Sequence, residues 1–227
     1  MPFSPQMLDL LTENVLRNDK QWYRDNRDRF KELVETPLAE FAERVNSYIV
    51  KADPTIDKVH ISRIYRDARF LGGKSFFREN MWVSFGRVKD LYKSLPAFYF
   101  DISPQGAEFG NGFYVADTAT MVQLRSMITA GSPKFNKALA AFEKAKDFEL
   151  YGDLYKKSRF PDSPEKLRNW LDRKTIGVFS RSEDWDLIFS ADYADHVGKR
   201  LTAVKDVYDL FLSAALAAGA GSEDEKV

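Results

Sequence analysis

The sequence contains no cysteine and only two histidines, which stand far apart as His60 and His196. The absence of cysteine excludes disulfides, thiolate metal sites and cysteine nucleophiles. The two distant histidines exclude a histidine-rich metal site, and no spacing among the 34 acidic residues points to a carboxylate metal site. No serine stands in a G-x-S-x-G nucleophile elbow. The sequence therefore predicts no metal site, and it leaves open the cofactor and whether the protein is an enzyme.

The sequence also lacks an excess charge of either sign and a long apolar run. Its 34 basic and 34 acidic side chains cancel, which argues against a nucleic-acid partner bound through bulk charge. No apolar stretch reaches the ~18 residues of a membrane-spanning helix, and no basic segment followed by an apolar run marks a signal peptide. We therefore expect a cytoplasmic protein with no membrane partner, and its oligomeric state stays open.

Helices are predicted toward both ends of the chain. Ser-Pro pairs begin at Ser4, Ser132 and Ser163, and they favour helix starts because serine caps the first turn and proline has no N–H to lose there. A further helix begins after residue 18 or 19 and carries Trp22, which we expect to be buried at the head of an apolar stripe. Pro37 either starts a new helix or kinks a continuous one. The last predicted helix begins near residue 190 and includes residue 212.

The middle of the chain changes from a helical period to an alternating one, with many β-branched and aromatic residues. This pattern predicts strands at 59–70, 80–86 and 97–103, a further strand at 106–114, and weaker ones at 148–155 and 175–179. Short connections favour antiparallel pairing.

The order of these elements predicts a fold class. Helices, then strands, then helices indicate a single α+β domain over residues 1–218, with a mainly antiparallel central sheet packed by the N-terminal and C-terminal helices on one face. Residues 219–227 are small and charged, and they predict a disordered tail.

Residues 66–80 contain Gly-Gly-Lys-Ser, which looks like the end of a phosphate-binding loop. A P-loop requires glycine where this chain has Ala68, and it must open a helix. The residues that follow alternate like a strand, so the segment is not predicted to be a P-loop. The Gly-Gly pair instead predicts a tight turn between strands, which brings Lys74 and Arg78 back beside the first strand.

Three motifs identify a resemblance. They are Trp-Tyr-Arg-Asp-Asn-Arg from Trp22, Arg-Asp-Ala-Arg-Phe from Arg66 followed by Lys74-Ser75, and an aromatic strand that ends in Ile-Ser-Pro at 102–104. Their order and spacing resemble the DUF2461 family from residue 3 to residue 216. The family is one of unknown function, so the resemblance implies no activity. The chain departs from the family's Pro-Tyr-Lys, because Phe-Phe-Arg stands there and a tyrosine hydroxyl is lost at Phe77.

The cations of the predicted hairpin suggest a ligand site. Several cations near a sheet surface attract anions, and the guanidinium fork suits phosphate or carboxylate. We therefore predict a site for a small phosphorylated or carboxylated ligand. Its residues are Arg66, Arg69, Lys74 and Arg78 of the hairpin, Asn26 and Arg27 of the helix at its rim, and Asp101 of a neighbouring strand. Tyr99, Asp101 and Ser103 share one strand face, which lies either opposite the arginines or in solvent.

Two alternatives stay open. Asp67, Glu79 and Asp101 can neutralise the cations, in which case the motifs hold the fold together and the domain is a non-catalytic interaction module. Interleaved basic and aromatic residues at 74–78 and 156–160 instead suit a nucleic acid, although the zero net charge weakens this interpretation.

Overall fold

A computed structural model describes residues 3–67, 72, 75–87 and 95–220 of the chain. Its centre is a six-stranded sheet in the order β1-β2-β3-β4-β6-β5, in which every neighbouring pair is antiparallel. The strands are β1 (Lys58–Ile61), β2 (Met81–Gly86), β3 (Ala97–Ser103), β4 (Gly106–Gly112), β5 (Glu149–Tyr151) and β6 (Gly177–Ser182). The predicted antiparallel sheet is therefore confirmed, including the weaker strands around residues 150 and 178, although the first strand ends at Ile61 instead of continuing to residue 70.

The two faces of the sheet have different chemistry. Along β2 and β3, every second residue is buried, as Val83, Phe85, Phe98 and Phe100 illustrate. Because successive side chains of a strand point to opposite faces, the residues between them lie on the other face. That second face carries polar and aromatic residues, which are half-buried along β2 and β3. One face of the sheet thus supplies the core, and the other is available for a site.

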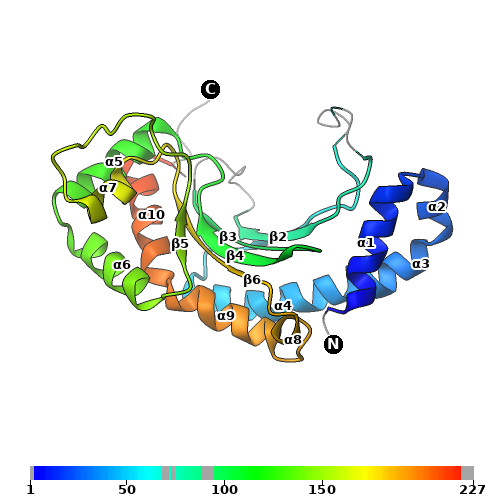
Figure 1. The fold of residues 1–227 in the computed structure, drawn as a ribbon. Coiled ribbons are helices and arrows are strands. Elements are labelled where there is room, and N and C mark those ends of the chain that lie inside the picture. The colour runs from blue at the N-terminus through cyan, green and yellow to red at the C-terminus, as the bar shows by residue number, and fades with distance from the viewer. Residues whose placement is uncertain (1–2, 68–71, 73–74, 88–94, 221–227) are drawn as a thin grey trace, which may run out of the picture.

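Helices cover the apolar face and both ends of the sheet. Figure 1 shows a curved sheet whose convex face lies on α4 and α9, while its concave face opens away from them. At one end lie α5, α6, α7 and α10, and at the other end lie α1, α2 and α3. Their bounds are α1 (Pro5–Arg17), α2 (Lys20–Asp25), α3 (Arg27–Phe30), α4 (Thr36–Ala52), α5 (Thr118–Thr129), α6 (Pro133–Lys144), α7 (Glu165–Leu171), α8 (Trp185–Ile188), α9 (Tyr193–Ala203) and α10 (Lys205–Ala217). Among the described residues, no helix is long and apolar enough to cross a membrane.

The predicted helix starts agree with the caps. The side chains of Ser4, Asp19, Asp117 and Ser132 each accept a hydrogen bond from a backbone N–H of the first turn. These bonds satisfy donors that a helix start leaves free. The third Ser-Pro pair also precedes a helix, although α7 has no side-chain cap.

Pro37 lies in a continuous helix and does not start a new one. A π-helical segment η1 (Lys31–Glu35) joins α3 to α4, and the backbone stays helical from Phe30 through Thr36. Proline cannot donate to the preceding turn and crowds it, and the wider π turn accommodates both effects. The continuous alternative is therefore the correct one.

The prediction of one long C-terminal helix is wrong. The helix is interrupted at Val204 (φ −104°, ψ 22°), which separates α9 from α10. The break lets α9 pack on α4 while α10 packs on α5 and α6. The apolar stripe continues through the break because both halves face one core, so the periodicity did not reveal it.

Trp22 is less buried than expected. Its neighbour Tyr23 is the buried residue, with 6% of its surface exposed, while Trp22 is half-buried. The Tyr23 ring packs on Tyr65 and Phe77 at centroid distances of 5.1 and 5.3 Å, whereas Trp22 packs against Phe30 at the edge of the core. With only 6 residues, α2 has too few turns for its periodicity to tell which aromatic faces inward.

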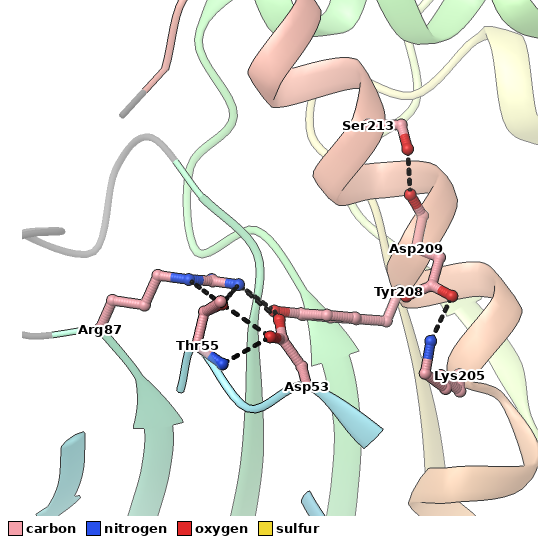
Figure 2. Close-up of polar contacts among 7 residues, drawn as sticks. All are labelled: Asp53, Thr55, Arg87, Lys205, Tyr208, Asp209 and Ser213. Carbon is pink, nitrogen blue, oxygen red and sulfur yellow. Dashed lines mark hydrogen bonds and ion pairs between the residues drawn. The ribbon is translucent and has the colours of Figure 1, made fainter. Parts of the chain in front are cut away.

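A buried ion pair fastens α4 and α10 to the end of β2. Figure 2 shows Arg87 reaching from β2 to Asp53, with Tyr208 of α10 pointing at the same carboxylate. The Arg87–Asp53 distance is 2.5 Å, and the Tyr208 hydroxyl donates to Asp53 at 2.7 Å. Burial alone would raise the pKa of Asp53, but hydrogen bonds from Thr55 and Tyr208 and the charge of Arg87 outweigh it and lower that pKa. Asp53 is thus held as a carboxylate.

We predict that Tyr23→Ala lowers the free energy of unfolding by about 3–5 kcal/mol, because it removes a buried aromatic ring. Trp22→Ala should cost less, about 1–2 kcal/mol, because less apolar area is lost. Urea denaturation of both variants measures the difference. A larger loss for Trp22→Ala would contradict the assignment of Tyr23 as the inward residue.

We also predict that Arg87→Met destabilises the fold by about 3–5 kcal/mol, because it leaves Asp53 buried and unpaired. Lys166→Met is the matched control, since it removes a cation whose pair with Glu143 is exposed. The control should cost less than about 1 kcal/mol. Equal losses of unfolding free energy in urea denaturation would show that the Arg87–Asp53 pair stabilises the fold no more than an exposed ion pair does.

Candidate functional site

Residues 62–66 and 75–80 extend the β1–β2 hairpin beyond the sheet. The Ser62 amide donates to the Trp82 carbonyl, the Arg78 amide to Ile64, and the Arg66 amide to Phe76, at 2.8 to 2.9 Å. We call residues 62–66 and 75–80 the hairpin arm. Figure 1 shows the arm rising from the sheet toward α1. Arg78 thus returns beside the first strand as predicted.

Two candidate residues of the arm, Arg69 and Lys74, lie outside the described residues. At the described position between them, Gly72 has φ 46°, a left-handed conformation that favours glycine in a turn. The other glycine of the predicted Gly-Gly turn lies outside the described residues.

Arg66 and Arg78 form the cationic part of the site. Arg66 Nε donates to the Phe77 carbonyl at 3.0 Å. Burial, followed by the charge of Arg66, lowers the pKa of Arg78, and Asp101 opposes this shift. Arg78 Nε is buried and has no hydrogen-bond partner among the described residues. The arm therefore holds two neighbouring guanidinium groups, one of which has an unsatisfied donor.

Asp101 of β3 stands next to these cations. Asn80 Nδ2 donates to Asp101 Oδ2 at 2.5 Å. Burial raises the pKa of Asp101 to about 6, and Glu108 adds to the rise, while the Asn80 hydrogen bond and the charge of Arg78 act against it. Asp101 therefore changes charge close to neutral pH.

Asp101 belongs to a row of side chains that crosses the concave face. The strand register places Trp82 opposite Asp101, Asp101 opposite Glu108, and Glu108 opposite Arg181. Directly opposite residues have Cβ atoms about 4.5–5.5 Å apart, so the two carboxylates are neighbours. The Tyr99 hydroxyl donates to Glu108 Oε1 at 2.7 Å.

A second tyrosine lies on the same face, beyond Tyr99. Tyr151 of β5 covers Gly177, where an added Cβ would come within 2.2 Å of the tyrosine ring. Its hydroxyl donates to the Phe113 carbonyl at 3.2 Å, and its ring stands edge-on to Tyr99 at 6.2 Å. Burial and the charge of Glu108 raise the pKa of both phenols, so both stay neutral donors.

On the other side of the row, His60 packs against Trp82 at 5.1 Å. Burial, followed by the charges of Lys58 and Arg63, lowers the pKa of His60. The histidine is therefore neutral around pH 7. Among the described residues, no group of side chains has the geometry of a metal site.

Asn26 and Arg27 have partners within the helical layer. Asn26 Nδ2 donates to the Trp22 carbonyl at 2.9 Å, and Arg27 pairs with Glu35 at 2.7 Å. Within the described part of the chain, neither makes a hydrogen bond or ion pair with the arginines of the arm or with Asp101. The helices still reach the arm, because Asn18 Oδ1 accepts from the Phe76 amide at 2.7 Å.

Sequence reasoning missed Asn80, Glu108 and Tyr151. The alternation of Tyr99 and Asp101 marked one polar strand face, but Glu108 stands in a glycine-rich stretch, where the pattern is weak. Only the pairing of β3 with β4 brings Glu108 opposite Asp101. Asn80 follows the basic residues of the hairpin directly, but the sequence assigns it no role in the site.

We predict that Asp101→Asn stabilises the protein at pH 7.5 by roughly 1–2 kcal/mol, allowing for partial exposure. The folded pKa of about 6 exceeds the ~3.9 of an unfolded aspartate, so stability falls as pH rises from about 4 to 6. The gain should disappear near pH 4 in urea denaturation. Glu149→Gln, which removes an exposed carboxylate from the same face, should give no such gain, and a gain at all pH values would refute the assignment.

Comparison with known proteins gives a family and no activity. No curated protein matches the chain. The model of the family described as a conserved hypothetical protein (DUF2461) matches residues 6–210 of the 227. The match begins in the first turn of α1, includes the hairpin arm and the whole sheet, and ends within α10. The chain therefore belongs to the DUF2461 family, as its motifs predicted.

Proposed function

We propose that the hairpin arm and the concave face bind a small phosphorylated or carboxylated ligand. Arg66 and Arg78 bind its anionic group, with Arg69 and Lys74 from the same hairpin, and Asp101 adjoins that group. Asn26 and Arg27 belong to the rim. The observation that carries the proposal is the environment of Arg78. Its Nε is buried without a described hydrogen-bond partner, and the positive charge of Arg66 lies nearby.

A buried donor without a partner costs about 1–3 kcal/mol, and two like charges add repulsion. A bound anion reduces the repulsion, because it neutralises both cations and accepts hydrogen bonds from guanidinium N–H groups. Among the described residues, no ion pair joins Arg66 or Arg78 to a carboxylate. The charges of two described carboxylates, Asp101 and Asp67, act on Arg78, and Asp101 is already held by Asn80. These features support a ligand more than a structural salt-bridge network.

The nucleic-acid alternative receives less support. Its two basic-aromatic stretches adjoin opposite edges of the sheet, one next to β1 and β2, the other after β5. The aromatic residue of the second stretch, Phe160, is partly buried against the core. Arg159 of this stretch covers the ring of the preceding Tyr155 at 3.9 Å. The stretches therefore do not form one continuous stripe of stacking aromatic rings.

We predict that sulfate binds the parent protein saturably and that Arg78→Met abolishes this binding. Arg78→Met should leave stability unchanged or raised, because it removes an unsatisfied donor and a like charge. The control Arg181→Met removes an exposed cation of the same sheet and should bind sulfate like the parent. Isothermal titration calorimetry separates binding from the general stabilisation by sulfate. A collapse of stability in Arg78→Met, with no sulfate binding by the parent, would mean that the arginines are structural.

We further predict that sulfate binds more tightly as pH falls from 7.5 to 5.5. Sulfate stays a dianion over this range, while Asp101, with a pKa of about 6, loses its negative charge. Removal of one neighbouring charge should change affinity by roughly tenfold, about 1.4 kcal/mol. Asp101→Asn should bind equally at both pH values. A pH dependence that survives this substitution would assign the titration to another group.

A further inference from the structure

The concave face carries acceptors as well as the cations of the arm, and this combination restricts the ligand. Asp101 Oδ2 accepts a hydrogen bond from Asn80, and Glu108 Oε1 accepts one from Tyr99. Within the described structure, no side chain donates to the other oxygen of either carboxylate. Each carboxylate is therefore fixed by one bond and presents a second, oriented acceptor.

The arrangement of these groups follows from the strand register. Asp101 and Glu108 lie directly opposite each other, with Trp82 beyond Asp101 in the same row. Tyr151 covers Gly177, and its ring stands edge-on to Tyr99. Trp82 thus lies beside Asp101, and Tyr99 is bonded to Glu108. Arg181 lies beyond Glu108 in the row, while Arg78 adjoins Asp101 from the arm. A ligand that fits all three elements has an anionic end, hydroxyl donors next to it, and a face of C–H groups.

We infer that the ligand is a carbohydrate that carries a phosphate or carboxylate group. Its anionic group lies on Arg66 and Arg78, neighbouring hydroxyl groups donate to Asp101 and Glu108, and its C–H face packs on the aromatic rings. A hydroxyl that donates to a carboxylate makes a stronger bond than one that donates to a neutral acceptor. Aromatic side chains supply large apolar faces for such a ring. This inference rests on the proposed function, because it uses the same arginines.

The test compares ligands of equal charge on the full chain. Ribose 5-phosphate and glucose 6-phosphate are titrated by calorimetry beside cyclohexylmethyl phosphate, which has a ring and a phosphate but no hydroxyl groups. Inorganic phosphate serves as the probe of the anion site alone. We expect at least one sugar phosphate to bind about tenfold or more tightly than cyclohexylmethyl phosphate, a difference of about 1.4 kcal/mol.

Glu108→Gln locates the hydroxyl contacts. The amide oxygen of glutamine can still accept from Tyr99, so the variant keeps this bond, and its melting temperature checks the fold. It should lose about tenfold in affinity for the sugar phosphate, because a charged acceptor becomes neutral, and keep its affinity for inorganic phosphate. Glu149→Gln, at the exposed edge of the same face, should change neither affinity.

The outcomes separate the two proposals. If inorganic phosphate binds but neither sugar phosphate binds more tightly than cyclohexylmethyl phosphate, the carbohydrate inference is wrong and the anion site stands. Sugar-phosphate binding that is insensitive to Glu108→Gln also overturns the inference. If no phosphate binds at all, the anion site and the carbohydrate inference both fail.

Discussion

The strict alternation of side chains along the central strands is the constraint on which the candidate site depends. Phe98, Phe100 and Ile102 point to the helices, so Tyr99 and Asp101 must point to the concave face. A slip of one residue would send Asp101 into the core and expose the phenylalanines. The burial of the apolar set therefore fixes the register, and the register in turn places Asp101 opposite Glu108. The chemistry of one face is held in place by the packing of the other.

The two polar clusters of the protein differ in how their carboxylates are stabilised. The Asp53–Arg87–Tyr208 cluster is compact and pairs its carboxylate with three neighbouring residues, as expected for a structural anchor. Arg87 and Arg78 each leave one buried N–H without a described partner, so the two clusters differ in their carboxylates. Hydrogen bonds and the charge of Arg87 lower the pKa of Asp53, whereas the pKa of Asp101 is raised by burial that its partners do not offset. Carboxylates with raised pKa values are concentrated at functional sites. This contrast within one chain is the reason to place function on the concave face and stability in the anchor.

The sequence predicted what depends on local pattern and missed what depends on tertiary packing. Strand alternation and the Ser4, Asp117 and Ser132 caps are local, and each was correct. The choice between Trp22 and Tyr23 depends on which ring meets the arm, and the break at Val204 depends on the different partners of α9 and α10. Of the candidate site, the cations of the hairpin and the polar face of β3 could be predicted. Glu108 and Asn80 could not, because only strand pairing and the course of the arm bring them to Asp101.

Two of the three segments that mark the family, the helical motif and the hairpin, meet at one contact, although they lie far apart in the sequence. Tyr23, from the helical motif, packs on Tyr65 and Phe77 of the arm, and Tyr65 and Phe77 pack on each other at 4.9 Å. Phe77 has no exposed surface, so the hydroxyl that this chain lacks at that position would have to be accommodated within this aromatic cluster. The departure from the family pattern therefore concerns how the helices hold the arm. The arm in turn sets the position of Arg78, and hence the distance between the cations and the carboxylates of the concave face. Through this contact, a substitution in α2 can change the site without touching a ligand.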